Sequence, residues 1–382
     1  MSKKDLADVC NYMKGITIPH TPDDFVVAEL FRHGLTDEEL RAGITAFRTF
    51  LYKLYDKLAE NKNKFDVKTG AKYAPGAGED SVRKCFPIIT DIAVILFSLG
   101  LHGRLDTEPR KELVVSGSDL LIPFPKSAGQ TEKYFSISKL TAKRKLEIFD
   151  FLSGLGFYFE DVNFSEEVDF AKTGTFCVRY DDDDFLVVGL KLLAEATVNI
   201  KAKYYQLADA FMLGDFYPLA NLQPKPQVPN LQVLVGGQSP EVKKWILDID
   251  KFLADNGCKV VGDSNSFTYT LRKNKKQICK IYLSITGGVI RPNVYHLANK
   301  QHIDGLTDNM LEHMRGGRGC GICAEKDPNF VHCRHGGPYC ITHDDEYFER
   351  CRYQGFNFPL DNAAERETLR MWVEAELASF CH

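Results

Sequence analysis

The sequence lacks any apolar run long enough to cross a membrane. Its longest apolar stretch, residues 86–101, includes Asp91 and is shorter than the roughly 18 residues of a spanning helix. We therefore expect a buried helix there. The first residues, MSKKDLADVCNYMK, also lack the apolar core of a secretory signal peptide, so a cytoplasmic location is expected.

The sequence also lacks a strong net charge. Its 48 Lys and Arg residues against 52 Asp and Glu residues give a formal charge of −4. Nucleic-acid-binding domains usually carry clustered positive charge, so this composition argues against a nucleic acid partner, although a local basic patch could hide inside a neutral total. With 382 residues, 44% of them hydrophobic, the chain is long enough for about two or three domains with sizeable cores.

Familiar catalytic signatures are absent. The stretch GGRGCG at residues 316–321 lacks the Lys and the Ser or Thr of a phosphate-binding loop. VSGSD at residues 115–119 lacks a nucleophile elbow and a paired histidine, and Asp181–Asp184 lack the spacing of a calcium-binding EF-hand. These absences favour a protein that is not an enzyme.

The patterns that are present predict an α+β fold. A capping box, TDEE at residues 36–39, begins an amphipathic helix, and residues 1–135 are expected to form a mainly helical N-terminal region. Three prolines within residues 221–230 predict a linker over residues 221–238. It separates a first α/β module, residues 136–220, from a second, residues 239–382.

The two modules are expected to be copies of one design. Each begins with a helix, which ends at FLSGLG (residues 151–156) or at FLADNG (residues 252–257). Downstream, IKAKYYQLAD at residues 200–209 matches IRPNVYHLAN at residues 290–299 in spacing and residue type. We interpret this as an internal repeat of a helix and a three-stranded antiparallel meander. The predicted strands are residues 175–180, 185–193 and 196–202 in the first module, and residues 266–273, 277–285 and 287–293 in the second.

The repeat makes Tyr205 equivalent to Tyr295 and Lys201 equivalent to Arg291. The two tyrosines are expected to pack a helix on a sheet, with the lining of a pocket as the alternative. The two cations beside them are the polar residues that we would name as ligand contacts.

Cysteines are concentrated towards the C-terminal end. Four of the 11 cysteines lie within residues 320–340, and Cys351 follows. Because cytosolic thiols stay reduced, such a cluster suggests a metal before a disulfide. Cys320 and Cys323 form a Cys-x-x-Cys turn among glycines, which supplies two of the four ligands that a tetrahedral zinc ion needs.

The spacing of the cysteines does not identify the second pair of zinc ligands, because there is no second Cys-x-x-Cys. The candidates are Cys333, Cys340 and Cys351, with His332, His335 and His343 as substitutes. Residues 338–358 indicate a hairpin that turns near Asp344–Asp345, in which Cys340 is an ordinary strand residue. We therefore favour Cys333 and Cys351.

The residues from about Ser239 to Phe380 resemble a group of uncharacterised bacterial proteins. In that group a helix–meander module ends in a cysteine-rich loop, which leads into a "KCR" hairpin and a final acidic helix. The matching features here are Cys320, Cys323 and Cys333, the hairpin YFERCRYQGFNFPL and the helix LRMWVEAEL. The resemblance implies Cys333 and Cys351 as ligands rather than Cys340, and it implies no known activity.

A structural zinc ion is therefore expected, with Cys320, Cys323, Cys333 and Cys351 as its ligands. Residues 314–338 are rich in glycine and poor in apolar side chains, so metal binding would supply the free energy that orders them. The sequence favours a non-catalytic zinc protein that binds a small molecule or a partner protein in a groove between its modules. The alternatives are a metal-dependent enzyme that uses the Cys and His cluster, and a transcriptional regulator whose N-terminal helices bind nucleic acid.

Overall fold

The protein divides into two compact units. A computed structural model describes residues 5–17, 21–65, 86–122, 137–162, 169–198, 211–220, 231–263, 265–284, 287–297, 300, 302–316, 338–351 and 355–381. Of these, residues 5–220 form unit 1 and residues 231–381 form unit 2. Both units contain helices and antiparallel sheets, which confirms the predicted α+β class. Among the described residues, no helix is both long and apolar enough to span a bilayer.

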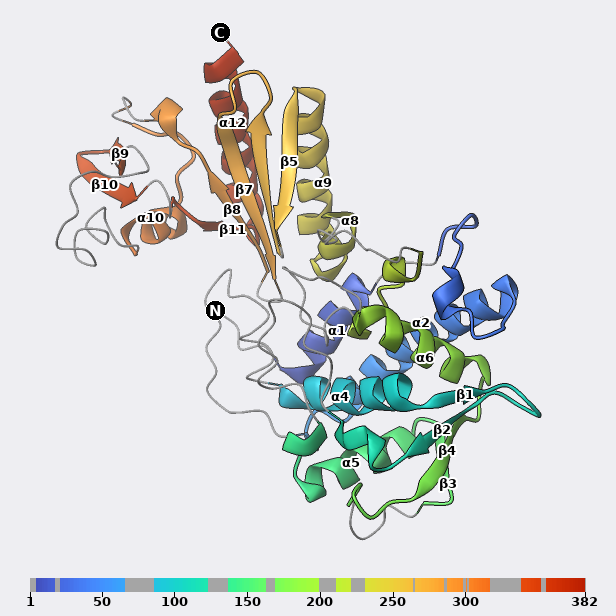
Figure 1. The fold of residues 1–382 in the computed structure, drawn as a ribbon. Coiled ribbons are helices and arrows are strands. Elements are labelled where there is room, and N and C mark those ends of the chain that lie inside the picture. Colours follow the sequence, from blue (N-terminus) through green and yellow to red (C-terminus); the bar gives the residue numbers. More distant parts are fainter. Residues whose placement is uncertain are drawn as a thin grey trace, which may run out of the picture. The chain divides into compact units, whose positions relative to one another are not determined.

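Unit 1 combines a helical bundle with a four-stranded sheet (Figure 1). Its helices are α1 (Leu6–Ile16), α2 (Asp37–Glu60), α4 (Pro87–His102), α5 (Ala142–Ser153) and α6 (Phe185–Val198). Its strands are β1 (Arg104–Asp106), β2 (Glu112–Ser116), β3 (Phe157–Glu160) and β4 (Thr175–Tyr180), in the antiparallel order β1-β2-β4-β3. Because β2 pairs with β4, the boundary that we placed at residues 135/136 does not separate two domains.

Helix α2 follows the amphipathic pattern of its sequence. At its first turn, the Thr36 hydroxyl accepts a hydrogen bond from the Glu39 N–H, and the Glu39 carboxylate accepts one from the Thr36 N–H. The apolar face that this helix buries is Leu40, Ile44, Phe47, Leu51, Leu54 and Leu58. The apolar run at residues 86–101 is also a buried helix, α4, as predicted.

Helix α6 corrects the sequence-based prediction. Residues 185–193 are predicted as a strand, and so are residues 196–202, yet residues 185–198 form one helix. The helix packs on both α2 and α4, and its apolar residues are buried all around it. A helix without a polar face shows no helical periodicity, so a short apolar run cannot be distinguished from a strand by pattern.

Unit 2 contains a five-stranded antiparallel sheet and a separate hairpin (Figure 1). Its helices are α8 (Leu231–Leu234), α9 (Pro240–Asp255), α10 (Asp308–Arg315) and α12 (Ala363–Cys381). The strands of the sheet are β5 (Cys258–Asp263), β6 (Ser266–Leu271), β7 (Gln277–Ser284), β8 (Gly287–Pro292) and β11 (Phe358–Pro359), in the order β11-β8-β7-β6-β5. The hairpin consists of β9 (Pro338–His343) and β10 (Glu346–Cys351).

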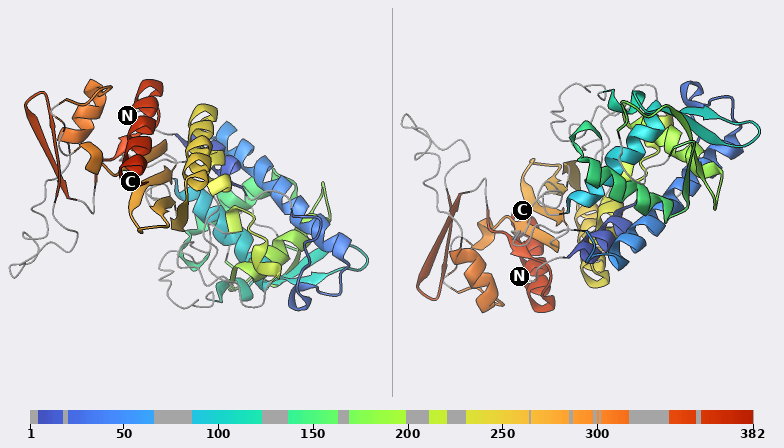
Figure 2. Two further views of the ribbon diagram at one scale, coloured as in Figure 1. Left: turned by 90° about the horizontal axis from the view of Figure 1, so that it is seen from above. Right: turned by 90° about the horizontal axis from the view of Figure 1, so that it is seen from below.

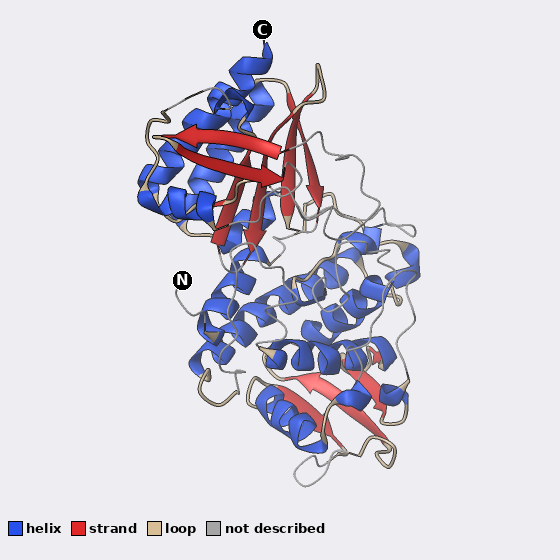
Figure 3. Ribbon diagram, turned by 90° about the vertical axis from the view of Figure 1, so that its left-hand side faces the viewer, coloured by secondary structure: helices blue, strands red, loops and turns tan. Residues whose placement is uncertain are grey.

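Helices α9 and α12 cover one face of the five-stranded sheet (Figures 1 and 3). The Tyr269 hydroxyl of β6 donates to the Asp250 carboxylate of α9 at 2.9 Å. The Trp245 indole of α9 donates to the backbone carbonyl of Arg366 in α12 at 3.1 Å, and the two helices lie side by side (Figure 2). The apolar stripes of the two helices are mostly buried, and the two members that are only half-buried are Phe252 and Phe380. The buried members are Val242, Trp245, Ile246, Ile249 and Leu253 in α9 and Leu369, Trp372, Val373 and Leu377 in α12.

The predicted repeat is matched only in its first half. Helices α5 and α9 are each followed by a glycine with positive φ, 107° at Gly156 and 77° at Gly257, and then by an antiparallel strand pair. Unit 1 continues with helix α6, where unit 2 continues with strand β7. The meander predicted for residues 136–220 is therefore wrong, and residues 200–209 lie outside the described residues. The internal repeat stays a prediction.

The predicted linker is only partly tested by the structure. The division between the two units falls at residues 228/229, inside the range 221–238. Residues 231–238, however, form α8 and a short 3₁₀ turn that belong to unit 2, and Leu231, Leu234 and Val235 are buried there. Their apolar side chains pack into the unit, so this part of the range is not a linker.

Candidate functional site

Cys351 is the predicted zinc ligand that falls within the described residues. Cys320, Cys323 and Cys333 lie outside them, as do His332 and His335. Cys351 is the last residue of β10 and is buried, whereas Cys340 in β9 is half-buried. Neither thiol forms a disulfide.

The hairpin presents both of its cysteines on one face. The register pairs Cys351 with Pro338 and Cys340 with Glu349. Because side chains alternate along a strand, the two thiols share a face as diagonal neighbours, whose Cα atoms are typically about 7–8 Å apart. The opposite face carries the buried side chains Tyr339, Ile341, Phe348 and Arg350. The geometry therefore allows Cys351 as a ligand and keeps Cys340 as the alternative.

The turn of the hairpin forms where the sequence predicts it. Asp344 and Asp345 both have positive φ, 46° and 69°. Two consecutive residues with positive φ define the type I′ turn, whose twist matches that of the flanking strands, and aspartate tolerates this conformation. The turn fixes the register on which the placement of the two cysteines depends.

Arginine side chains join the hairpin to helix α10. The buried guanidinium of Arg350 donates from Nη2 to the backbone carbonyls of His313 and Met314, each at 3.0 Å. These carbonyls belong to the last turn of α10, where a cation is favoured. Arg315, the final residue of α10, forms a bidentate ion pair with Glu346, at 2.8 Å from Nε and 2.6 Å from Nη2.

Both ends of the segment that carries the other predicted ligands meet at this hairpin. Helix α10 ends at Arg315, five residues before Cys320, and β9 begins five residues after Cys333. The first residue of β9, Pro338, is the strand partner of Cys351. Cys320 and Cys333 are therefore each five residues in sequence from an element that contacts or contains the hairpin of Cys351.

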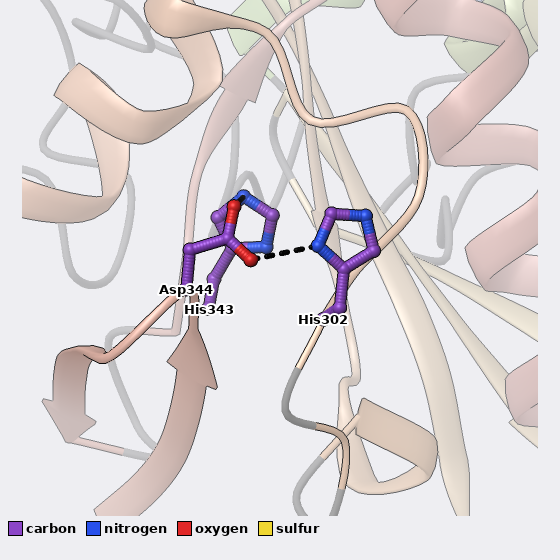
Figure 4. Close-up of side chains that lie close together, drawn as sticks. All are labelled: His302, His343 and Asp344. Atoms are coloured by element: carbon purple, nitrogen blue, oxygen red, sulfur yellow. Dashed lines mark hydrogen bonds and ion pairs between the residues drawn. The ribbon is translucent and has the colours of Figure 1, made fainter.

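A second cluster of metal-ligating residue types lies at the other end of the hairpin. His302, His343 and Asp344 each offer a ligand atom, and these atoms lie within 4.8 Å of one another. Figure 4 shows the hydrogen bond between His302 Nδ1 and Asp344 Oδ1, 2.8 Å long, with the His343 ring beside the same carboxylate. His302 and Asp344 are exposed, and His343 is largely buried.

The hydrogen bonds of His343 do not suit a metal ion. The Ile303 N–H donates to His343 Nδ1 at 3.1 Å, which requires the lone pair on that nitrogen. In the neutral imidazole the proton is then on Nε2, which faces Asp344 Oδ2 at 3.4 Å. The Nδ1 lone pair thus accepts the Ile303 N–H and Nε2 carries the proton, so neither ring nitrogen offers a free lone pair. We interpret the cluster as a clamp that fastens the hairpin turn to residues 302–304.

The clamp makes a testable prediction about His302. A hydrogen bond to Asp344, together with the charge of that carboxylate, raises the pKa of His302, and the reciprocal bond lowers the pKa of Asp344. We expect Asp344→Asn to lower the pKa of His302 more than Asp304→Asn does, because Asp304 contributes only a weaker Coulombic attraction. Titration of the His302 ring by NMR measures both shifts. Equal shifts in the two variants would contradict the clamp.

The same pair sets a pH window for hairpin docking. A raised His302 pKa stabilises the folded state below the ordinary histidine value of about 6.5, and this contribution is lost as pH rises through the folded-state pKa. The lowered Asp344 pKa stabilises the folded state above the ordinary aspartate value of about 3.9, and this contribution is lost as pH falls through the folded-state pKa. The clamp is therefore strongest between those two values.

The residues predicted as ligand contacts have different surroundings. Tyr295 packs its ring edge-on against Tyr339 and Phe380, with centroids 5.2 Å and 6.1 Å apart, which is the packing role that the sequence favours. Arg291 lies in β8 and donates from Nε to Asn357 at 2.9 Å. Tyr205 and Lys201 lie outside the described residues. The two repeat positions are therefore not brought together by any described contact.

Cysteines of the sheet behave as core residues. Cys258 and Cys279 are buried in β5 and β7, on the face that α9 and α12 cover. Burial raises the pKa of the Cys279 thiol well above its usual range, so it stays protonated and unreactive. Half-buried Cys177 of β4 has its pKa raised to about 11, by burial and then by a hydrogen bond with Glu112. These thiols are not candidates for metal binding.

Comparisons with known proteins found no relative of this chain. No protein family, curated protein or solved structure matches the chain. The resemblance of residues 239–380 to the bacterial group therefore stays a prediction, and no relative assigns an activity or a ligand to this protein.

Proposed function

We propose that the chain is a non-catalytic cytoplasmic binding protein whose C-terminal unit is organised by one structural zinc ion. The ligands are Cys320, Cys323, Cys333 and Cys351. The observation that supports this proposal is the convergence of both ends of the cysteine-bearing segment on the strand pair that contains Cys351. Four thiolates close a tetrahedral site, and a closed site is structural rather than catalytic.

The zinc ion would supply folding free energy. The hairpin that carries Cys351 is attached to α10 through Arg350 and Arg315. The free energy of metal binding would then become part of the stability of unit 2.

The alternative of a metal-dependent enzyme is less well supported. A catalytic zinc ion usually has fewer thiolate ligands and at least one histidine, and it keeps an open position. His343 is the substitute ligand that lies within the described residues, and its Nδ1 lone pair accepts the Ile303 N–H, which leaves the proton of the neutral ring on Nε2. The described part of the chain therefore favours a closed site made of thiolates.

Zinc content tests the proposal directly. Reduced, freshly purified protein should contain one equivalent of zinc by elemental analysis, Cys351→Ser should lose it, and Cys340→Ser should keep it. The two variants remove thiols from the same face of the same hairpin, so each serves as the matched control of the other. Metal-free wild-type protein would overturn the proposal. Loss of zinc only in Cys340→Ser would replace Cys351 in the ligand set.

A further inference from the structure

Positive charge is concentrated in one part of unit 2. Between Cys258 and Ile303 the sequence has eight Lys and Arg residues and one acidic residue, Asp263, so this stretch carries 8 − 1 = +7. The whole chain carries −4, so the remainder carries −4 − 7 = −11. The eight cations are Lys259, Arg272, Lys273, Lys275, Lys276, Lys280, Arg291 and Lys300. The net charge of the whole chain does not reveal this separation of positive and negative charge.

The basic stretch contains strands β5 to β8. One row of strand partners crosses the sheet from Val261 through Thr268 and Lys280 to Arg291. This row alternates with the row of Phe267 and Ile281, which is buried on the side of α9 and α12. Lys280 and Arg291 therefore lie on the face that those helices do not cover. We call this the basic face.

The basic face places two cations around one aromatic ring. Tyr282 lies two residues after Lys280 in β7 and so shares its face. The Nζ atom of Lys280 is 4.9 Å from the Tyr282 ring centroid, and the Cζ atom of Arg291 is 5.0 Å from it. Both distances are within the range of a cation–π interaction. An aromatic ring is thus held among positive charges in the middle of an antiparallel sheet.

The β6–β7 turn adds four exposed cations at the end of the same sheet. They are Arg272, Lys273, Lys275 and Lys276. None of these four, nor Lys259 on the basic face, makes an ion pair with a carboxylate of the described residues. These five cations repel one another, so the binding of a polyanion across them would lower the free energy of the surface.

We propose that the basic face and the β6–β7 turn bind single-stranded nucleic acid. Phosphates would contact Lys259, Lys280 and the turn residues Arg272, Lys273 and Lys275, and a base would stack at Tyr282 and Arg291. Single strands are bound by aromatic side chains on open sheet surfaces together with a positively charged track for the backbone. A broad sheet of this kind cannot enter a duplex groove, which admits a helix or a two-stranded ribbon.

The proposal names a ligand class for the binding role argued above, and it rests on that role but not on the zinc ion. It also replaces the expectation from net charge that nucleic acid is not a partner. Charge averaged over the chain cannot reveal a +7 stretch that is balanced by −11 elsewhere.

Fluorescence anisotropy with a labelled oligouridine of about 15 nucleotides tests the inference on the full-length protein. Binding should be detected at low salt and should weaken as salt is raised, with a slope of roughly 0.7 per phosphate contact on logarithmic axes. Tyr282→Ala should reduce affinity roughly tenfold through the loss of one stacked base. The double variant Lys273→Gln and Lys275→Gln should weaken binding and lower the salt slope.

The control removes the same charge from the other side of the sheet. Lys243 and Lys244 are exposed on helix α9, so the double variant Lys243→Gln and Lys244→Gln should leave affinity and salt slope unchanged. Equal losses in the two double variants would overturn the proposal, because binding would then follow total charge. Circular dichroism establishes that every variant is folded.

The same experiment is repeated with two other ligands, a nucleic acid duplex and lipid vesicles. Tighter binding to a duplex of the same length, or binding only to vesicles that contain phosphatidylserine, would overturn the assignment to single strands. Absence of binding up to about 100 µM oligouridine at low salt would overturn it as well. Zinc is measured on the same preparation. Zinc-free protein that still binds the oligonucleotide would contradict only the proposed zinc site. Zinc-containing protein that does not bind it would contradict only the proposal that the basic face binds nucleic acid.

Discussion

Gly189→Ala is expected to destabilise unit 1 strongly. A Cβ atom at this position of α6 would lie 2.9 Å from the Phe47 Cβ and 2.7 Å from the Gly43 carbonyl carbon, both in α2. These contacts are closer than carbon atoms can approach. The main obstacle is the Gly43 backbone, which cannot move aside by a change of rotamer as a side chain can. Adding a methyl group to a packed core usually costs about 1–3 kcal/mol of folding free energy. Because the clash here is with backbone, we expect a cost of about 3 kcal/mol or more.

The two tryptophans allow the effect to be assigned to one unit. Both Trp245 and Trp372 lie in unit 2, so tryptophan fluorescence follows that unit, whereas circular dichroism also follows the helices of unit 1. In urea, Gly189→Ala should shift or abolish the part of the circular dichroism transition that comes from unit 1 and leave the fluorescence transition in place. Gly174→Ala is the matched control, since a Cβ there meets no atom within 4 Å. A wild-type transition in Gly189→Ala would contradict the close helix contact.

Glu376→Ala is expected to destabilise unit 2 strongly. Glu376 of α12 is fully buried, and one of its oxygens accepts hydrogen bonds from the backbone N–H of His296 at 3.1 Å and from His296 Nδ1 at 2.7 Å. Removal of the carboxylate leaves both donors buried without a partner. Each buried donor that is left without a partner costs about 1–3 kcal/mol, which is a large part of the stability of a domain.

A neighbouring glutamate provides the comparison for this variant. Glu374 lies on the same helix and pairs with Arg370 at 2.9 Å, but both side chains are partly exposed. Glu374→Ala should therefore cost at most about 0.5 kcal/mol. The urea midpoint of the tryptophan fluorescence transition should fall sharply for Glu376→Ala and hardly move for Glu374→Ala. Similar midpoints in the two variants would show that the His296 pair contributes little.

Amphipathic elements are the part of this fold that the sequence predicts well. Helices α2, α9 and α12 each have apolar residues at helical spacing, and these residues form the buried faces. The hairpin turn at Asp344 and Asp345 is also predicted, because two aspartates between strand-like runs favour positive φ. In these cases local chemistry and tertiary packing agree.

Helix α6 could not be assigned in the same way, because tertiary burial on all sides removes the polar face that would reveal it. Its one helical signal is the pair Lys191 and Glu195, four residues apart, whose Nζ and Oε1 atoms are 3.0 Å apart. Strand pairing across long sequence distances, such as β2 with β4, leaves no local signal at all.

The candidate sites differ in how much the sequence reveals. Cysteine spacing gives a ligand set, but only the hairpin register shows that Cys340 and Cys351 share a face. The clamp joins His302 to Asp344, 42 residues later, and depends on how the hairpin docks. The basic stretch is marked in the sequence by the run RKNKK of the β6–β7 turn and by the scarcity of acidic residues around it, but averaging charge over the whole chain obscures it.

Strand β5 lies at the outer edge of the described sheet, and its neighbour on one side only is β6. Val260 and Val261 in this strand are 44% and 53% exposed. Exposed valines beside unpaired backbone groups are a template for adding another strand, and the two charged residues of β5, Lys259 and Asp263, are weak protection. At the concentrations used for crystallisation or NMR, edge-to-edge association of this protein should therefore begin at β5, and an added charge at Val261 is the substitution to make first when soluble material is needed.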